Sequence, residues 1–301
     1  MMGFIRQVLV VARHELADSI RSRRVVVFLI LYIAGAMLAC NLFITVIHKL
    51  ERQISSVMLL PESRTPGAVV DTVWKSKIFQ DMVVSMAGDR KIAQEFFNVP
   101  VIALFYAWLA FIFTPPLVML SASGRISEEV STGSARFALT RTSRGSWCLG
   151  KFFGQALEAL IPILLSAIGA WCVARFRLPT MDGPEAMRMM IIYSWKVWIY
   201  SLPYIGLALG ISQTTRSQYL AMTLGFTAWI VLAILSAIAA YFVGDGINQV
   251  WQLVQLLIPM DHMLGLWRTS VSHSCTAALF LVALAFAYMS AGYAFLSRKD
   301  L

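Results

Sequence analysis

The sequence predicts an all-α, polytopic membrane protein, and three observations support this fold class. The chain has 301 residues, of which 58% are hydrophobic and only 14% are charged, whereas soluble domains carry about 45–50% apolar and about 25% charged residues. Six apolar runs reach the roughly 20 residues that a helix needs to cross a bilayer. None of them alternates over about 10 residues, as the strands of a membrane barrel do. The net charge of +9 indicates contacts with lipid headgroups rather than with nucleic acid.

An amphipathic helix over residues 3–24 is the first predicted element, and we expect it to lie on the cytoplasmic membrane surface. Apolar residues recur along one face at helical spacing, and polar residues follow another face. The apolar face carries Ile5, Leu9, Ala12, Leu16 and Ile20, and the polar face carries Gln7, His14, Asp18 and Arg21. An apolar stripe with basic flanks is typical of an interfacial helix. His14-Glu15 begins like the zinc motif H-E-x-x-H, but Asp18 replaces the second histidine, so no zinc site is predicted.

Six membrane spans are predicted after this helix, within a single transmembrane domain over residues 1–301. Their ranges are about 25–47, 100–123, 148–173, 190–211, 219–243 and 273–296. The stretch MLAC (37–40) is similar to a lipoprotein cleavage box, but the apolar run continues to Ile47, which favours a retained span. Six spans place both termini on one side of the membrane. The total count of basic residues hardly separates the two orientations, yet the cluster Arg21–Arg24 directly before the first span favours cytoplasmic termini. We expect a multi-pass protein of the bacterial inner membrane with both termini in the cytoplasm.

Two segments are predicted on the outer side. The loop 48–99 contains a predicted amphipathic helix, because Trp74, Ile78, Met82 and Met86 recur four residues apart. A helix that caps the bundle is the favoured interpretation, and a gate or partner site is the alternative. The segment 244–272 is too polar to span and is broken at Pro259. We expect it to form a re-entrant element of two short helices, which is tolerated in a membrane only where protein covers it.

Lys196 and Glu158 lie well within predicted spans, away from their ends. Lys196 stands among Tyr193, Trp195, Trp198 and Tyr200, so a lysine that reaches the outer interface is favoured, and contact with a transported molecule is the alternative. Glu158 is the only acid in the predicted spans and has no evident partner in the sequence. It either lines a pathway or lies near the headgroups. An intramembrane enzyme is not predicted, because such enzymes need paired catalytic groups.

The stretch GSWCLGKF (145–152) matches the phosphate-loop pattern G-x-x-x-x-G-K-[ST] except at its last position. A working loop follows a buried strand, opens a helix and uses its hydroxyl to hold Mg²⁺. Here Phe152 has no hydroxyl and an apolar run follows, so nucleotide binding is not predicted. We expect Lys151 at headgroup level, at the entry to the third span. The cysteines form no C-x-x-C pair, and the methionines and histidines over 187–190 and 260–273 lack tight ligand spacing, so no metal site is predicted.

The stretch ISEEVSTGSARFALTRTSRGSWCLGK, from Ile126 to Lys151, resembles the cytoplasmic loop of the type-2 ATP-binding-cassette permeases. In that family an acidic pair precedes a small-Gly-small turn, a short helix, a polar turn with Arg, and Leu-Gly-Lys at the next span. The matching segments are Glu128-Glu129, Ser131–Ser134, Phe137–Leu139, Thr142–Arg144 and Leu149–Lys151. The N-terminal ARHELADSIRSRR, the span count and the broken segment before the last span also match, so the resemblance covers nearly the whole chain. Thr140-Arg141 departs from the Ser/Thr-Pro of many members, which leaves the end of the short helix open.

The resemblance implies a permease subunit of an ATP-driven transporter. ATP and Mg²⁺ would bind to a separate cytoplasmic ATPase, this chain would hold no cofactor and would not itself be an enzyme, and a second copy of the chain is an expected partner. The coupling loop 126–147 would contact the ATPase, because a short helix with apolar residues and flanking charges suits an interface. Its candidate residues are Glu128, Glu129, Gly133, Ser134, Arg136, Phe137, Leu139, Arg141 and Arg144. Arg216, in the turn 213–218, is a second predicted contact.

Export is the direction that the resemblance implies, because most members of the family export lipids, polysaccharides, drugs or peptides. Within the family, the alternative is a permease of a periplasmic maturation or motility complex, similar to the nitrous-oxide-reductase maturation group. Outside the family, the alternative is a channel or membrane scaffold without ATP coupling. Co-purification of an ATPase that has no membrane spans distinguishes a permease of this family from a channel or scaffold.

Overall fold

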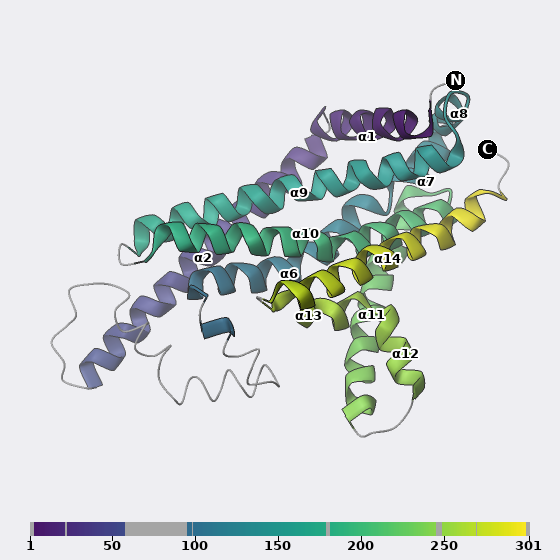
Figure 1. Cartoon of the computed structure of the whole chain (residues 1–301). Coiled ribbons are helices and arrows are strands. Elements are labelled where there is room, and N and C mark those ends of the chain that lie inside the picture. Colours follow the sequence, from purple (N-terminus) through teal and green to yellow (C-terminus); the bar gives the residue numbers. More distant parts are fainter. Residues whose placement is uncertain are drawn as a thin grey trace. The chain divides into compact units, whose positions relative to one another are not determined.

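The computed structural model describes residues 3–21, 23–57, 95–97, 99–178, 181–244, 249–268 and 270–298. Within these ranges the chain is helical and forms no strand (Figure 1). The predicted all-α fold class is therefore confirmed. The predicted outer helix around 74–86 lies outside the described residues, and so do residues 245–248 of the predicted re-entrant segment.

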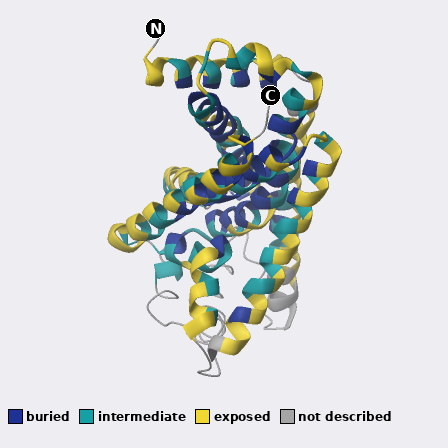
Figure 2. Ribbon diagram, turned by 90° about the vertical axis from the view of Figure 1, so that its right-hand side faces the viewer, coloured by how far each residue is buried: buried dark blue, intermediate teal, exposed yellow. Residues whose placement is uncertain are grey.

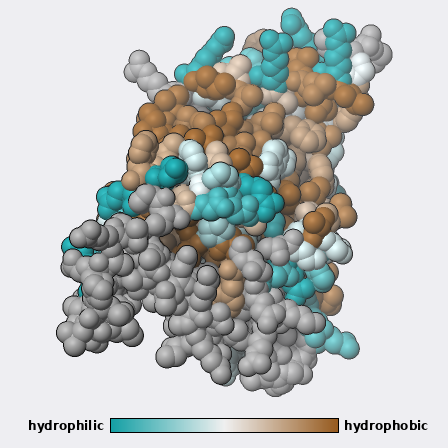
Figure 3. Space-filling model, turned by 60° about the vertical axis from the view of Figure 1, so that its left-hand side comes forward, coloured by the Kyte–Doolittle hydropathy of each residue, from teal (hydrophilic) through white to brown (hydrophobic). Residues whose placement is uncertain are grey.

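Among the residues that the structure describes, five helices are long and apolar enough to cross a membrane. They are α2 (Arg23–Val57), α6 (Val101–Ala122), α9 (Arg144–Arg177), α11 (Gln218–Gly244) and α14 (Val271–Leu296). The predicted span 190–211 lies within a sixth long helix, α10 (Gly183–Thr214), which is not among the five. Large apolar side chains are exposed along these helices, and hydrophobic side chains cover a broad part of the face seen in Figure 3. This surface is what helices that face lipid are expected to present.

The shorter helices follow the breaks that the sequence indicated. They are α1 (Phe4–Arg21), α7 (Arg125–Thr132), α8 (Ser134–Leu139), α12 (Gln249–Leu257), the 3₁₀ turn η1 (Pro259–His262) and α13 (Met263–Trp267). The segment that was predicted to split at Pro259 does so, because a proline cannot continue the preceding helix but suits the first turn of the next one.

Two compact units make up the described chain. Unit 1 contains residues 1–26, 111–161 and 196–301, and unit 2 contains residues 27–110 and 162–195. The helices α2, α6, α9 and α10 each contribute one part to unit 1 and another part to unit 2.

In unit 1, the backbones of α10 and α14 are in direct contact. A Cβ atom added at Gly206 would lie 2.2 Å from the carbonyl oxygen of Ala285, and one added at Gly210 would lie 2.7 Å from that of Tyr288. On the facing helix, a Cβ at Gly292 would lie 2.4 Å from the Cα of Gly210. Small residues four apart allow membrane helices to approach in this way. The glycines therefore make α10 the core helix of unit 1.

Protein surrounds this part of α10, and its side chains reflect that environment. Tyr200, Tyr204 and Leu209 are buried, and the two tyrosine hydroxyls lie 3.0 Å apart. The indole nitrogen of Trp198 donates a hydrogen bond to the carbonyl oxygen of Ala156 at 2.7 Å. A helix that is covered by protein satisfies its polar groups internally and needs less hydropathy than a helix that faces lipid.

In unit 2, Tyr106 on α6 is the centre of a buried polar group. Its hydroxyl donates to the carbonyl oxygen of Ile163 at 2.7 Å and lies 3.1 Å from Ser166 Oγ and 3.3 Å from Ser194 Oγ. These contacts join α6, α9 and α10. The ring of Phe43 on α2 stacks on that of Phe105 with centroids 4.0 Å apart, which adds α2 to the same unit.

Candidate functional site

The predicted short helix is present as α8 and leaves α7 through a left-handed glycine. Gly133 has φ of +76°, a conformation that other residues adopt only with strain. Beyond this turn, α8 presents Phe137 with 78% of its surface exposed. Arg136 and Arg141 are also exposed, whereas Ala135 is buried. Gly133 thus allows the chain to turn between α7 and the short helix α8, which exposes Phe137.

The structure settles where this helix ends. Leu139 is the last residue of α8, and residues 140–143 form the turn that the polar stretch Thr142–Arg144 predicted. The departure from the family pattern at Thr140-Arg141 therefore coincides with the end of the helix. The next helix, α9, begins at Arg144, four residues before the predicted start of the third span at 148.

Lys151 lies at the centre of a buried ion-pair cluster. Its Nζ atom lies 2.6 Å from Glu15 Oε2 on α1 and 2.6 Å from Glu129 Oε1 on α7, and only 2% of its side chain is exposed. Lys151 is thus buried among carboxylates of this chain rather than exposed to lipid headgroups, and its level in the membrane stays a prediction. The sequence could not show this burial, because Glu15 is 136 positions away and its carboxylate is what allows the ammonium group to be buried.

Glu158 forms the other end of the same cluster. Its carboxylate pairs with Arg125 at 3.0 Å and accepts hydrogen bonds from Ser19 Oγ at 2.5 Å and Gln155 Nε2 at 2.8 Å. Gln155 Nε2 also donates to Glu15 Oε1 at 3.3 Å, which joins the two ends. No partner of Glu158 was evident in the sequence, because its ion-pair partner Arg125 and the hydroxyl of Ser19 come from α7 and α1.

The charged cluster, as we call Glu15, Ser19, Arg125, Glu129, Lys151, Gln155 and Glu158, holds three carboxylates against two cations. Charges removed from water need partners and hydrogen bonds to offset the lost hydration. Each of the five charged groups has an opposite charge within 3.0 Å. The cluster therefore fastens α1 and α7 to the first turns of α9. Among the described residues, no group of three His, Cys, Asp or Glu side chains is arranged to hold a metal ion.

Close backbone packing between α1 and α9 supports the cluster. A Cβ at Gly150 would lie 2.5 Å from Val11 Cβ, and one at Gly154 would lie 2.7 Å from Glu15 Cβ. The residues 145–152 that match the phosphate-loop pattern lie inside α9. Their backbone N–H groups beyond the first turn bond within the helix. In this pattern Gly150 serves packing and Lys151 serves ion pairing.

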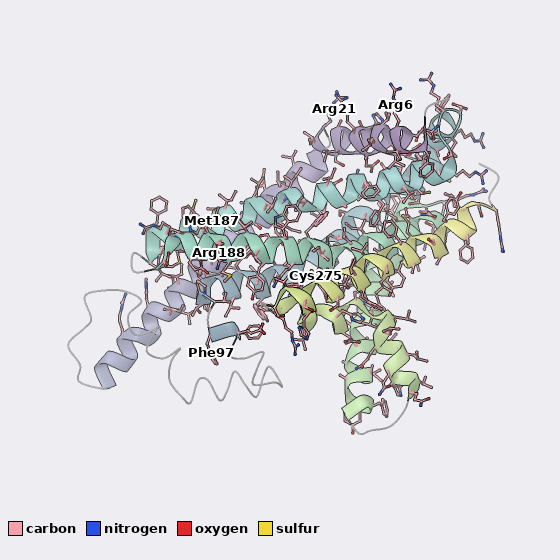
Figure 4. The ribbon with its side chains drawn as sticks, viewed as in Figure 1. Arg6, Arg21, Phe97, Met187, Arg188 and Cys275 are labelled. Atoms are coloured by element: carbon pink, nitrogen blue, oxygen red, sulfur yellow. The ribbon has the colours of Figure 1, made fainter. Side chains whose placement is uncertain are left out.

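The helix α1 has a face that the sequence pattern did not reveal. Val8, Ala12, Glu15 and Ser19 are buried, whereas the predicted apolar residues Ile5, Leu9 and Ile20 are exposed. Buried and exposed residues alternate along this helix, which starts at the N mark in Figure 2. Arg6 and Arg21 point away from α9 (Figure 4). The helix thus presents one face to α9, a second apolar face to its surroundings and a third basic face.

The N-terminus of α7 is capped by a side chain from α10. The buried Ser212 accepts hydrogen bonds through Oγ from the backbone nitrogens of Ile126 at 3.0 Å and Ser127 at 2.9 Å. These are the N–H groups that a local capping residue satisfies in other helices. Gly124, which occupies the local capping position, has no side chain to do so. Sequence reasoning missed Ser212, although the absence of a local Ser, Thr, Asp or Asn at this position was a signal.

Three further predicted residues lie elsewhere. Arg144 donates to the carbonyl oxygens of Leu296 at 3.3 Å and Ser297 at 2.9 Å, which satisfies the end of α14 with a cation. Arg216 is exposed in the turn between α10 and α11. Lys196 is half-buried and donates to the carbonyl oxygen of Arg268 at 2.8 Å. Of the predicted contact residues, Glu129 and Arg144 therefore have partners within the chain, whereas Arg136, Phe137, Arg141 and Arg216 are exposed.

The long apolar helices define a multi-pass helical membrane protein, in which the charged cluster fastens α7, the helix that precedes the short exposed α8, to α1 and α9. A family model described as ABC-2 family transporter protein matches residues 9–301. The chain therefore belongs to the ABC-2 transporter family, and the predicted resemblance is confirmed. A search among curated proteins found no match. Membership also supports an ABC permease that associates with an ABC ATPase and the membrane.

Proposed function

We propose that this chain is the membrane-spanning subunit of an ATP-driven exporter and that α8 receives force from a separate cytoplasmic ATPase. The observation that carries the proposal is the exposed aromatic ring of Phe137 on a short helix that the charged cluster holds in place. Truncation of an aromatic residue that fills a pocket often removes most of the binding energy of an interface. Arg136 and Arg141 supply the charges that fix orientation and encounter rate.

The contact surface follows from exposure. It comprises Phe137 with the exposed Ser134, Arg136 and Arg141, together with the half-exposed Glu128 and Leu139. Gly133 sets the direction of α8. Glu129 pairs with Lys151, and Arg144 bonds to the carbonyl oxygen of Ser297, so both residues hold elements next to this surface rather than form part of it. Arg216 lies in the turn that follows Ser212, whose hydroxyl caps α7, so it lies near the base of this surface.

The sixth span in this proposal is α10. Its 32 residues exceed the length that a membrane requires, and its moderate hydropathy agrees with its cover of protein. A helix of this kind lines the interior of a transporter rather than its lipid face. In this arrangement the transported molecule passes close to α10, where Lys196 is a candidate contact.

Contacts within unit 1 gather several chain segments at one end. Gln7 near the N-terminus accepts a hydrogen bond from Ser146 at 2.8 Å, and Arg144 bonds to Ser297 near the C-terminus. Both termini and the turn 140–143 that follows α8 therefore belong to the same side of the membrane. We assign this side to the cytoplasm, because Arg6, Arg13, Arg21, Arg136 and Arg141 are exposed there. A cysteine that replaces Ser134, in a chain with Cys275 changed to serine, is expected to react only with reagents added from the cytoplasm.

The remaining parts of the proposal rest on the family. As the family implies, ATP and Mg²⁺ bind to the partner, and in this chain residues 145–152 are part of a helix that packs against α1. The exposed apolar residues of α1 rest on the membrane interface. A second copy of this chain completes the pathway, and the direction is export, from the inner membrane of a bacterium.

Co-purification tests the proposed contact. The intact chain, extracted from membranes, is expected to retain an ATPase that has no membrane spans. The change Phe137→Ala should reduce the amount retained at least about tenfold, because aromatic anchors of interfaces contribute about 2 kcal/mol or more. The matched control is Phe176→Ala, since Phe176 is another phenylalanine near a helix end and is 87% exposed. Equal retention by the two variants would contradict the proposed role of α8.

A further inference from the structure

The two carboxylates that pair with Lys151 differ in how well they are enclosed. The side chain of Glu15 is 9% exposed, and that of Glu129 is 32% exposed. If Lys151 left Glu15, a buried carboxylate would lose its counter-charge, which is costly. If Lys151 left Glu129, water would hydrate the freed carboxylate at little cost. The pair with Glu15 is therefore the permanent one, and the pair with Glu129 is the one that can open.

The pair that can open is attached directly to α8. The carbonyl oxygen of Glu129 accepts hydrogen bonds from Ser134 Oγ on α8 and from Thr132 Oγ1, both at 3.3 Å. The hydroxyl oxygens of Thr132 and Ser134 lie 3.0 Å from each other. A displacement of α8 thus acts on the turn of α7 that carries Glu129. No side chain at Gly133 resists this displacement.

We propose that Lys151 and Glu129 form a latch between α9 and the base of α8, which opens when the ATPase displaces α8. Lys151 keeps Glu15 throughout, so that α1 and the start of α9 move as one body. The last turn of α7 follows α8 away from them. The latch rests on the proposed function, and it adds a residue pair that sets how readily the ATPase displaces α8. Lys151 and Glu129 are positioning residues in this scheme, because neither touches nucleotide.

The test uses the whole transporter, purified with its ATPase and placed in lipid nanodiscs. The change Glu129→Gln should leave the amount of bound ATPase unchanged and lower the melting temperature by no more than about 2 °C. It should raise ATP hydrolysis in the absence of substrate about fivefold, the factor that corresponds to loss of an ion pair worth about 1 kcal/mol. Glu129→Asp keeps the charge and should hydrolyse ATP at a rate between those of the wild type and Glu129→Gln.

Glu15→Gln should behave in the opposite way. It removes the buried partner, so the melting temperature should fall by several degrees while the hydrolysis rate per folded complex does not rise. The matched control is Asp18→Asn, because Asp18 is an exposed acid on the same helix that pairs with His14 at the surface. This control should change neither quantity.

The outcomes separate the latch from the proposed function. If the wild-type chain retains no ATPase, the proposed function fails and the latch fails with it. If the ATPase is retained but Glu129→Gln hydrolyses ATP at the wild-type rate, the latch alone is wrong. If Glu129→Gln and Glu15→Gln lower the melting temperature equally without changing hydrolysis, the cluster is only structural and the latch is again wrong.

Discussion

The hydroxyl oxygen of Ser212 on α10 lies 2.9 Å from the backbone nitrogen of Ser127 on α7, 85 positions away in the chain. The helix α7, from which α8 departs, is therefore joined to α10 near its start and to α9 through Glu129. It connects the proposed ATPase contact to the helix that we propose lines the pathway.

We predict that Ser212→Ala destabilises the protein by about 1–3 kcal/mol, because two buried N–H groups lose their acceptor. Thermal unfolding of the purified protein in detergent measures the effect. The matched control is Thr223→Ala, since Thr223 is exposed and its hydroxyl bonds only to the preceding turn of α11. A Ser212→Ala protein as stable as this control would show that the cap contributes nothing.

The glycine of the phosphate-loop pattern offers a second prediction. We expect Gly150→Ala to destabilise the protein by about 1–3 kcal/mol, because the added methyl group would overlap Val11 and the backbone of Val8. The change should also make α1 more sensitive to protease. Gly145→Ala is the control, because it lies in the same helix and pattern but its nearest neighbour would be 3.8 Å away. Similar effects of the two changes would contradict the packing role.

The contact between α10 and α14 is expected to tolerate substitution least. The change Gly206→Ala would place a methyl group 2.2 Å from the backbone oxygen of Ala285. A backbone atom cannot move aside as a flexible side chain can, so we expect a loss of at least about 3 kcal/mol and a low yield of folded protein. Size-exclusion chromatography in mild detergent measures this yield. Gly35→Ala, where a methyl group meets nothing within 4 Å, should give the wild-type yield.

Asp261, in the turn after α12, predicts a dependence of stability on pH. Burial raises the pKa of this carboxyl, and a hydrogen bond from Ser236 and the nearby His262 oppose the rise only in part. Because the folded-state pKa exceeds the unfolded value of about 3.9, the folded state favours the protonated form. The protonated Asp261 carboxyl stabilises the folded state fully below the unfolded-state pKa of about 3.9. This stabilisation is lost as the pH rises through the higher folded-state pKa.

The change Asp261→Asn mimics the protonated form and retains an acceptor for Ser236. We therefore expect this variant to melt at a higher temperature than the wild type near neutral pH, with the difference shrinking as the pH falls toward about 4. Melting curves over this range are the measurement. A variant that is less stable than the wild type at neutral pH would show that the ionised carboxylate is favourable, contrary to this account.

Local patterns predicted the all-α fold class, the turn at Gly133 and the break at Pro259. Each of these depends on residues within about 20 positions, over which hydropathy and turn chemistry act directly. The residues of α8 that are exposed were predicted for the same reason. The span count was not settled in this way, because the hydropathy of α10 reflects a cover of protein that a local pattern does not contain.

Only the tertiary structure decided the partners within the charged cluster. Lys151 and Glu15 are 136 positions apart, and Ser19 and Glu158 are 139 apart. A lysine at the start of an apolar run reads as a headgroup contact unless its counter-charge is known, because burial of a charge depends on which opposite charge the fold brings to it. Only the tertiary structure likewise explains Gly150. A side chain at this position would overlap Val11 and the backbone of Val8 on α1, which are far from Gly150 in sequence.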